Sequence, residues 1–228
     1  MTVSKMAREV VVTKKKKKRT GQIVRITPHH MAGNCGDNPE SVAKAHANSA
    51  KDVSANYYIG NDGSVCAGAE EEYRAYTSKN AANDNSAITI EISNNCSKSP
   101  WTISDAALNA FYDLAADICR RYNIIPHYDG TKNGTITTHN MFVKTLCPGP
   151  YLEGLLKDGT IEKEINRRLG IQQEPVKPSG QRKTPEEIAK EVISGKWGVG
   201  EDRKNRLTKA GYNYREVQKI VNNMLRRK

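Results

Sequence analysis

Four residues that lie far apart in the chain have the side chains of a hydrolytic metal site. They are His29, His139 and Cys147, the last eight residues after His139, and Glu91, which lies among isoleucines in residues 87–93. Zinc binds imidazole nitrogen and thiolate sulfur, and a catalytic zinc site has three protein ligands. A buried glutamate costs free energy unless it is paired or functional, and it can serve as a general acid and base. These residue types predict zinc hydrolase chemistry. Their spacing alone is also compatible with His and Cys residues that lie apart in the folded protein.

Short β-strands are expected to position these side chains. The apolar segment 23–26 predicts a strand that ends near Pro28, because proline has no N–H for the ladder. His29 and His30 would then lie at a strand end. Residues 87–93 are rich in β-branched side chains and predict a second, buried strand.

Other segments alternate between helical and extended patterns. The mixed order indicates an α/β body. The expected elements are a helix over 40–51, strands at 57–59 and from Val65 joined by the turn Asn61-Asp62-Gly63, a helix from Thr102 with Asp105 as its capping-box partner, and a helix of about fifteen residues that ends at Gly170.

The positive charge is concentrated at the two ends. The chain of 228 residues has 36 Lys and Arg against 25 Asp and Glu. Residues 1–20 have eight basic residues and one acidic residue, residues 184–228 have eleven and six, and the part between them has a net charge of −1. Cationic ends attract a nucleic acid, a membrane surface or an anionic cell wall. The near-neutral body argues against a nucleic-acid-binding groove.

Composition also bears on location and cysteine chemistry. No apolar run approaches the roughly 18 residues of a membrane span, and no signal peptide is evident, so we expect a soluble protein without membrane insertion. The five cysteines include no C-x-x-C pair, which does not favour a disulfide framework.

The composition and the helical periodicity of the sequence divide the chain into four parts. Residues 1–20 are predicted to be a mobile basic arm, residues 21–170 the catalytic domain, residues 171–183 a linker and residues 184–228 a second module. The second module starts at Thr184-Pro185-Glu186-Glu187, which combines an N-cap, a proline at the first helical position and a capping box. Its three helical segments predict a minimal three-helix bundle.

Five segments of the body resemble a known enzyme family. They are ITPHHMAG (26–33), SANYYIGNDG (54–63), NDNSAITIEIS (83–93), WTISDAALNAFYDLAADICRR (101–121) and THNMFVKTLCPGPYL (138–152). Together they resemble the zinc-dependent N-acetylmuramoyl-L-alanine amidases of phage endolysins, in the amidase type 2 and peptidoglycan-recognition-protein superfamily. The resemblance runs in order over residues 21–155. It implies a mixed central sheet flanked by helices, a Zn²⁺ cofactor and bacterial peptidoglycan as the partner.

The resemblance also implies roles for individual residues. By motif position, His29, His139 and Cys147 would be the zinc ligands and Glu91 the acid/base that holds the nucleophilic water. Thr145 occupies the position where relatives have Lys or Thr, which implies an oxyanion-stabilising role.

Two positions depart from the family pattern. Ala55 stands where some relatives have a tyrosine near the zinc, which puts more of the catalytic burden on the glutamate. Pro28 replaces an aliphatic residue and is expected to shift the strand end slightly.

The remaining histidines and one lysine are expected to have other roles. His30 should point away from its neighbour and pack or support the site. His127 does not have the ligand spacing, and His46 is expected on the surface of a helix. Lys144 lies three residues before Cys147 rather than two, so no catalytic role is assigned to it.

The C-terminal module resembles the three-helix cell-wall-binding repeat of phage lysozymes and amidases. The resemblance covers residues 187–225 and implies peptidoglycan binding. Asp202, Arg203 and Gln218 are candidates for bonds to the muramyl peptide, and Trp197 for stacking on a sugar. For Trp197 the alternative is packing in a small core, because so small a bundle needs its aromatic residues.

The function that this resemblance implies is that of a phage endolysin. It would hydrolyse the amide between N-acetylmuramic acid and L-alanine and remain in the host bacterial cytoplasm until lysis. The basic termini would add binding to anionic wall polymers. The alternatives are a zinc endopeptidase that cuts within the stem peptide and a peptidoglycan-binding protein without catalysis.

Overall fold

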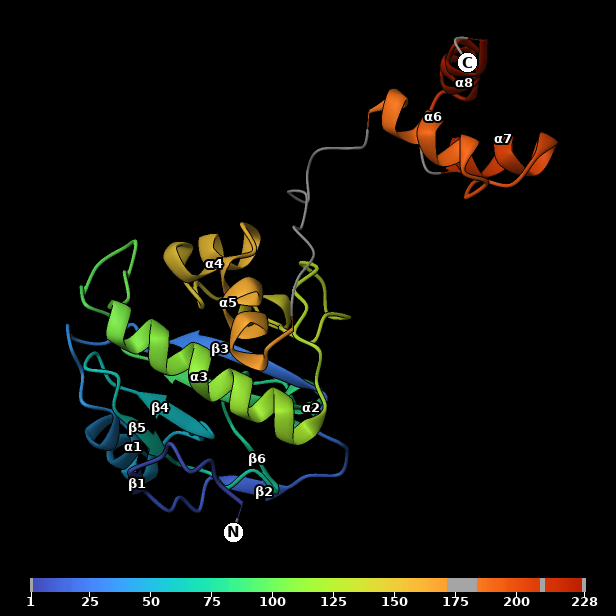
Figure 1. Ribbon diagram of the computed structural model, residues 1–228. Coiled ribbons are helices and arrows are strands. Elements are labelled where there is room, and N and C mark those ends of the chain that lie inside the picture. Colours follow the sequence, from blue (N-terminus) through green and yellow to red (C-terminus); the bar gives the residue numbers. More distant parts are fainter. Residues whose placement is uncertain (1, 172–183, 210–211, 227–228) are drawn as a thin grey trace. The chain divides into compact units, whose positions relative to one another are not determined.

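The computed structural model describes residues 2–171, 184–209 and 212–226. They fall into two compact units, one up to residue 174 and one from residue 175 (Figure 1). The predicted linker over residues 171–183 lies outside the described residues, apart from Ile171. None of the helices in the described segments has the length and apolar character needed to cross a membrane.

The first unit contains a mixed five-stranded sheet, as predicted. Its strand order is β1-β5-β4-β7-β3, in which only β4 and β5 pair antiparallel. A separate antiparallel pair joins β2 to β6. The strands are β1 (Glu9–Val10), β2 (Lys16–Lys18), β3 (Arg25–His30), β4 (Tyr57–Ile59), β5 (Val65–Ala67), β6 (Tyr73–Ala75) and β7 (Ala87–Ile92).

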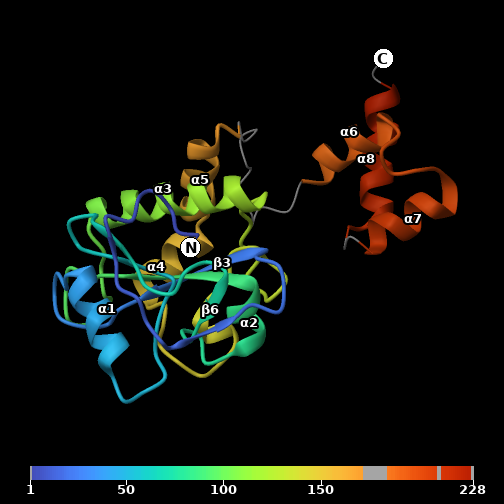
Figure 2. The ribbon, with the colours of Figure 1, turned by 90° about the horizontal axis from the view of Figure 1, so that it is seen from below.

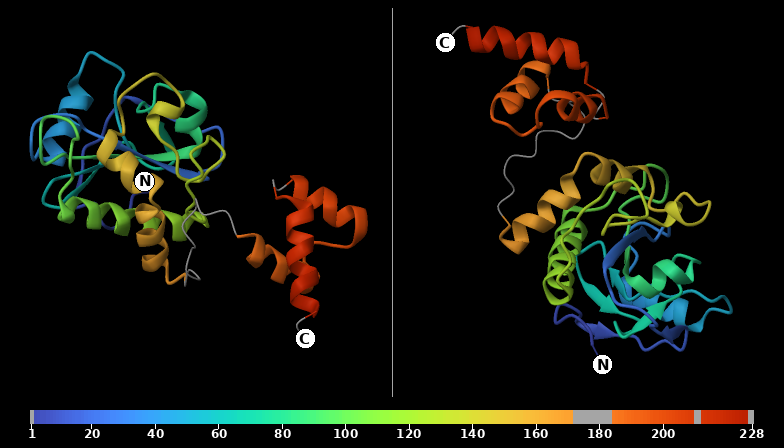
Figure 3. Two further views of the ribbon diagram at one scale, coloured as in Figure 1. Left: turned by 90° about the horizontal axis from the view of Figure 1, so that it is seen from above. Right: turned by 90° about the vertical axis from the view of Figure 1, so that its right-hand side faces the viewer.

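Helices cover both faces of this sheet, with α1 on one face and α3 on the other (Figures 2 and 3). The apolar core includes the isoleucines of β7 and the buried side of α3. The helices of this unit are α1 (Pro39–Asn48), α2 (Ala81–Ser86), α3 (Asp105–Tyr122), the 3₁₀ turn η1 (His139–Met141), α4 (Pro150–Lys157) and α5 (Thr160–Leu169).

The face covered by α1 contains the polar residues of the central strands. Successive side chains of a strand point to opposite faces, so Tyr57 packs in the main core while Tyr58 packs with Ala43 of α1. Glu91 is the register partner of both Tyr58 and His29. These three side chains therefore share the α1 face.

The prediction that residues 1–20 form a mobile arm is wrong. β1 pairs with β5, and β2 pairs with β6. Lys16 forms an ion pair with Glu70, and the Arg19 guanidinium donates to the carbonyls of Glu71 and Ala87 at 2.7 and 2.8 Å. Residues 14–19 are ordered because β6 provides a strand to pair with, and because Glu70 and nearby backbone carbonyls accept hydrogen bonds from the basic side chains. Composition alone does not reveal these partners.

Strand β3 continues through Pro28, which corrects the expectation that proline ends it. β3 is the edge strand next to β7. The N–H of Ile26 points away from β7 and donates to the carbonyl of Thr135 at 2.9 Å, and the nitrogen of Pro28 faces the same side. The missing N–H therefore costs no bond in the ladder with β7.

Two helix predictions also need correction. Helix α3 starts at Asp105 with Ser104 as N-cap, rather than at Thr102, because the Ser104 hydroxyl accepts the N–H of Ala107. The long helix before Gly170 is two helices, α4 and α5, because Gly159 between them has a left-handed backbone.

The second unit contains α6 (Pro185–Ile193), α7 (Gly200–Lys209) and α8 (Tyr214–Arg226). Thr184 and Glu187 form the predicted capping box at the start of α6. Residues 210 and 211 of the second unit lie outside the described residues. Its small core consists of Ile188, Ala189, Val192, Leu207, Val217 and Val221.

Candidate metal centre

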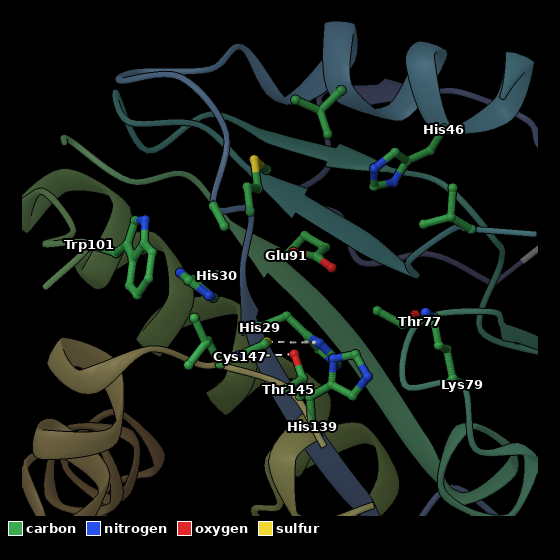
Figure 4. Close-up of a pocket in the computed structure, with 15 residues that line it drawn as sticks. His29, His30, His46, Thr77, Lys79, Glu91, Trp101, His139, Thr145 and Cys147 are labelled. Carbon is green, nitrogen blue, oxygen red and sulfur yellow. Dashed lines mark hydrogen bonds between the residues drawn. The ribbon is translucent and has the colours of Figure 1, made fainter. Parts of the chain in front are cut away.

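The three predicted metal ligands converge at one end of the sheet (Figure 4). His29 comes from β3, His139 from the start of η1 and Cys147 from the loop before α4. Their potential ligand atoms lie within 4.8 Å of one another. Cys147 Sγ is 3.3 Å from His29 Nδ1, and the two imidazole ring centroids are 4.9 Å apart. Residues 118 positions apart in sequence are thus side by side.

Hydrogen bonds around β3 hold this arrangement. The segment before η1 runs beside β3, where the N–H of Thr137 donates to the carbonyl of Ile26 at 3.1 Å. The N–H of Asn140 donates to the carbonyl of Cys147 at 3.2 Å, which joins the two ends of the 139–147 segment. These bonds bring His139 and Cys147 to the end of the strand that bears His29.

Burial keeps the two histidines neutral. It is the main cause that lowers the pKa of His29 well below its usual range and also lowers the pKa of His139. The positive charge of Lys79 is a second cause at His139. Neutral imidazole is the form that binds a metal. Burial likewise raises the pKa of the Cys147 thiol, so a cation would be required to hold it as thiolate.

The free donor atoms fit a zinc ion. Nε2 of His29 and Nε2 of His139 are buried and have no hydrogen-bond partner among the described residues. His139 also bonds to the backbone of Ser78 through its ring, an outer contact of the kind that orients a metal-binding imidazole. Sulfur and nitrogen atoms bound to one tetrahedral zinc ion lie about 3.6 Å apart. The distance of 3.3 Å between Cys147 Sγ and His29 Nδ1 is close to this value, so Nδ1 is the nitrogen of His29 that faces the sulfur.

Glu91 lines the same pocket, which has a volume of about 370 Å³. Burial raises the pKa of Glu91 to about 8. A carboxyl group with a pKa near neutrality can both accept and donate a proton during a reaction. The register of β7 places it beside His29, so the acid/base group and the candidate ligands share one cavity.

Thr145 lines the pocket two residues before Cys147. Its Oγ accepts the backbone N–H of Cys147 at 3.2 Å. Because this bond uses the oxygen as acceptor, the hydroxyl proton remains available to a group in the pocket. The geometry suits the predicted oxyanion-stabilising role.

The other histidines lie outside the candidate ligand group. His30 is buried, stacks edge-on against Trp101 at 5.0 Å and has its pKa lowered to about 4, mainly by burial. His127 faces Glu162 at 3.3 Å. The expectation that His46 is a surface residue is wrong, because it lines the pocket and its Nδ1 is 3.0 Å from the Tyr58 hydroxyl.

Lys144 and Ala55 lie outside the residues that line the pocket. Lys144 is exposed and does not line the pocket, and Ala55 is fully buried. The pocket residues to which the sequence assigned no role in the site include His46, Thr77, Lys79 and Trp101. Trp101 and Lys79 have left-handed backbones, with φ of 54° and 51°, a rare conformation that the sequence does not announce.

The candidate wall-binding residues of the second unit bond mainly to their own module. Trp197 packs against the small core and donates to Glu191 at 3.0 Å, in line with the packing alternative. Arg203 donates to Gln218 at 3.1 Å, and Asp202 pairs with Arg206 at 2.9 Å. A different pocket in this unit is lined by Lys204, Thr208, Tyr212, Asn213, Tyr214 and Arg215.

Known proteins resemble both parts of the chain. Residues 19–150 match the sequence profile described as N-acetylmuramoyl-L-alanine amidase, and residues 186–225 match the CW_7 repeat. No curated protein sequence matches the chain significantly.

Solved structures share the fold of the first unit. The structure of PlyL has 18% sequence identity and a TM-score of 0.55, covering 75% of this chain and 100% of PlyL. The Staphylococcus aureus hydrolase AmiA in complex with its ligand has 20% identity and a TM-score of 0.56, covering 72% and 85%. A mutant endolysin from Bacillus subtilis has 14% identity and a TM-score of 0.51, covering 69% and 98%.

Proposed function

The chain belongs to the N-acetylmuramoyl-L-alanine amidase family, and from this premise we propose that it is a zinc-dependent phage endolysin. As a member of the family it is a peptidoglycan amidase. The bond that it hydrolyses joins the lactyl group of N-acetylmuramic acid to the L-alanine of the stem peptide. The observation that supports the zinc proposal is the convergence of His29, His139 and Cys147, whose potential ligand atoms lie within 4.8 Å of one another.

His29, His139 and Cys147 would hold the metal ion. A bound zinc ion supplies Lewis-acid polarisation of the scissile carbonyl and lowers the pKa of a water molecule toward neutrality. The protein's contribution is to keep both imidazoles neutral by burial and to fix the ring of His139 through the Ser78 backbone.

Glu91 transfers the protons of the reaction. Its carboxylate accepts a proton from the attacking water and then donates it to the nitrogen of the leaving L-alanine. The apolar surroundings that raise its pKa to about 8 suit it to both steps near neutral pH. No covalent intermediate with the protein is needed, so Cys147 acts as a ligand and not as a nucleophile.

Thr145 stabilises the oxyanion that develops on the scissile carbonyl. We expect Thr145→Val to lower kcat by about 10²-fold, because removal of one oxyanion donor typically costs 10²- to 10³-fold. Thr145→Ser keeps both the donor and the acceptor for the Cys147 N–H and should retain most activity. Steady-state rates on purified wall check this, and a valine variant with wild-type kcat would remove Thr145 from the reaction.

The test of the bond specificity is amino-terminal analysis of digested cell wall. The amidase activity should expose amino groups of L-alanine and leave the stem peptides intact. New amino termini inside the stem peptide would instead identify an endopeptidase. Wall binding without any new termini would identify a recognition protein without catalysis.

The second unit is proposed to hold the enzyme on peptidoglycan, and the basic termini to add binding to anionic wall polymers. Lys14, Lys17 and Lys18 are exposed on and beside β2, which supports an electrostatic contribution from the folded N-terminal segment. A second site on one chain raises the local concentration of the enzyme at the wall.

The salt dependence of wall binding separates these two contributions. Substituting Lys14, Lys17 and Lys18 with glutamine should weaken sedimentation with purified wall at low salt by a few-fold and leave binding at high salt unchanged, because exposed charges are screened. The same loss at both salt concentrations would contradict an electrostatic role for these lysines.

The proposed endolysin remains in the host bacterial cytoplasm until the membrane is breached. Its role in lysis is supported by the amidase family and the presence of a CW_7 match on the same chain. In bacteria that express the chain, the wall should stay intact until the membrane is permeabilised. Wall degradation without permeabilisation would count against this cytoplasmic stage.

A further inference from the structure

The catalytic pocket has two chemically different ends. Figure 4 shows Trp101 and His30 on one side of the three candidate ligands and Thr77 and Lys79 on the other. One end therefore presents an aromatic ring, and the other end presents an ammonium group. A substrate that crosses the metal centre meets a different environment on each side of the bond to be cut.

The backbone of Lys79 is fixed beside the metal centre. Its φ of 51° is left-handed, which is unfavourable for a residue with a side chain. On one side, the buried Ser78 donates its N–H to the Asp84 carboxylate at 3.2 Å and bonds through its backbone to His139. On the other side, Asn80 caps α2 by accepting the N–H of Asn83 at 3.0 Å.

The charge of Lys79 is available to a ligand. The side chain is exposed at the pocket, and it forms no ion pair with any residue in the described parts of the chain. Figure 4 places Lys79 at the end of the pocket that is opposite Trp101 and His30. The ammonium group therefore offers its charge to a ligand at the end of the pocket opposite the aromatic ring.

The substrate has a matching asymmetry. On one side of the scissile amide is a muramic acid sugar ring, whose apolar face can stack on an aromatic side chain. On the other side is the stem peptide, whose second residue is a γ-linked glutamate with an α-carboxylate that is free in some walls and amidated in others. Two extended residues span at most about 7 Å, so this carboxylate stays close to the scissile bond.

We propose that Lys79 binds the α-carboxylate of the second stem-peptide residue and thereby sets the direction of the substrate, with the sugar toward Trp101. This inference rests on the proposed amidase function. It makes Lys79 a specificity-determining residue that acts in binding rather than in the chemical step. It also predicts that the enzyme prefers walls in which this carboxylate is free.

The test compares two purified walls that differ only in amidation of the second residue, with free L-alanine amino groups as the readout. Wild type should cleave the wall with the free carboxylate with a kcat/KM about fivefold higher, the scale of one partly exposed ion pair. Lys79→Met should lose this preference through a higher KM at nearly unchanged kcat, and Lys79→Arg should retain it. The matched control is Lys144→Met, which removes an exposed charge from the neighbouring loop outside the pocket.

The possible outcomes separate the inference from the function on which it rests. Equal cleavage of both walls by wild type, or a preference that survives in Lys79→Met, would overturn the role of Lys79 and leave the amidase intact. A loss of kcat in Lys79→Met on both walls would assign it to the chemistry instead of to carboxylate binding. Failure of wild type to release L-alanine termini from either wall would overturn the proposed function itself.

Discussion

Replacing Glu91 with glutamine is expected to lower kcat on purified peptidoglycan by about 10²- to 10⁴-fold, the usual contribution of a general acid or base. Glutamine has the shape of glutamate but cannot take up the proton of the attacking water. Burial opposes ionisation of Glu91, so the neutral amide should not lower the thermal unfolding midpoint. Steady-state kinetics and a thermal unfolding curve on the same preparation check both parts.

A matched control is Glu153→Gln, which removes a carboxylate that pairs with Lys157 on the surface of α4. This variant should keep the wild-type rate, since a surface ion pair contributes little. If Glu91→Gln binds metal normally, folds normally and still turns over at the rate of wild type, another group must move the protons.

Substitution of a metal ligand should have an effect at least as large. We expect His139→Ala and Cys147→Ser each to reduce both the zinc content of the protein and its activity, the latter by about 10³-fold or more. Each change removes one of three donors that meet within 4.8 Å. Metal analysis together with the rate on purified wall gives the two readouts.

His30, which follows the candidate ligand His29 in β3, provides a control substitution for the loss of a metal ligand. It is buried against Trp101 and does not belong to the group of candidate ligands. His30→Gln should therefore retain zinc even if packing against Trp101 is weakened. Full zinc content and full activity in Cys147→Ser would contradict the ligand assignment.

The resemblance to the amidase family predicted that His29, Glu91, His139 and Cys147 meet at one site, which their spacing alone did not establish. The side chains of these four residues are typical of a zinc hydrolase. The motifs around them occur in the same order as in the amidase family. The strand over 87–93 was predictable because its isoleucines are β-branched and apolar, which favours a buried strand. Its register, which sets Glu91 beside His29, depends on pairing with β3 and became visible only in the structure.

Contacts between distant segments account for what the sequence did not predict. From the sequence, Lys16 was expected to belong to a charged tail. In the structure its strand pairs with β6 and its side chain forms an ion pair with Glu70. His46 was expected on the surface, but its Nδ1 lies 3.0 Å from the Tyr58 hydroxyl in the structure. Lys79 is one of many lysines in the sequence, and only its place beside His139 distinguishes it.

The central claim is that one zinc-dependent site cleaves the bond between N-acetylmuramic acid and L-alanine. Its most direct test is mass spectrometry of the products released from purified peptidoglycan by wild type, by a zinc-stripped sample and by the stripped sample after zinc is restored. The account predicts intact stem peptides that begin with L-alanine from the first and third samples and none from the second. Release of the same peptides by fully stripped protein, or of peptides cut internally by wild type, would contradict it.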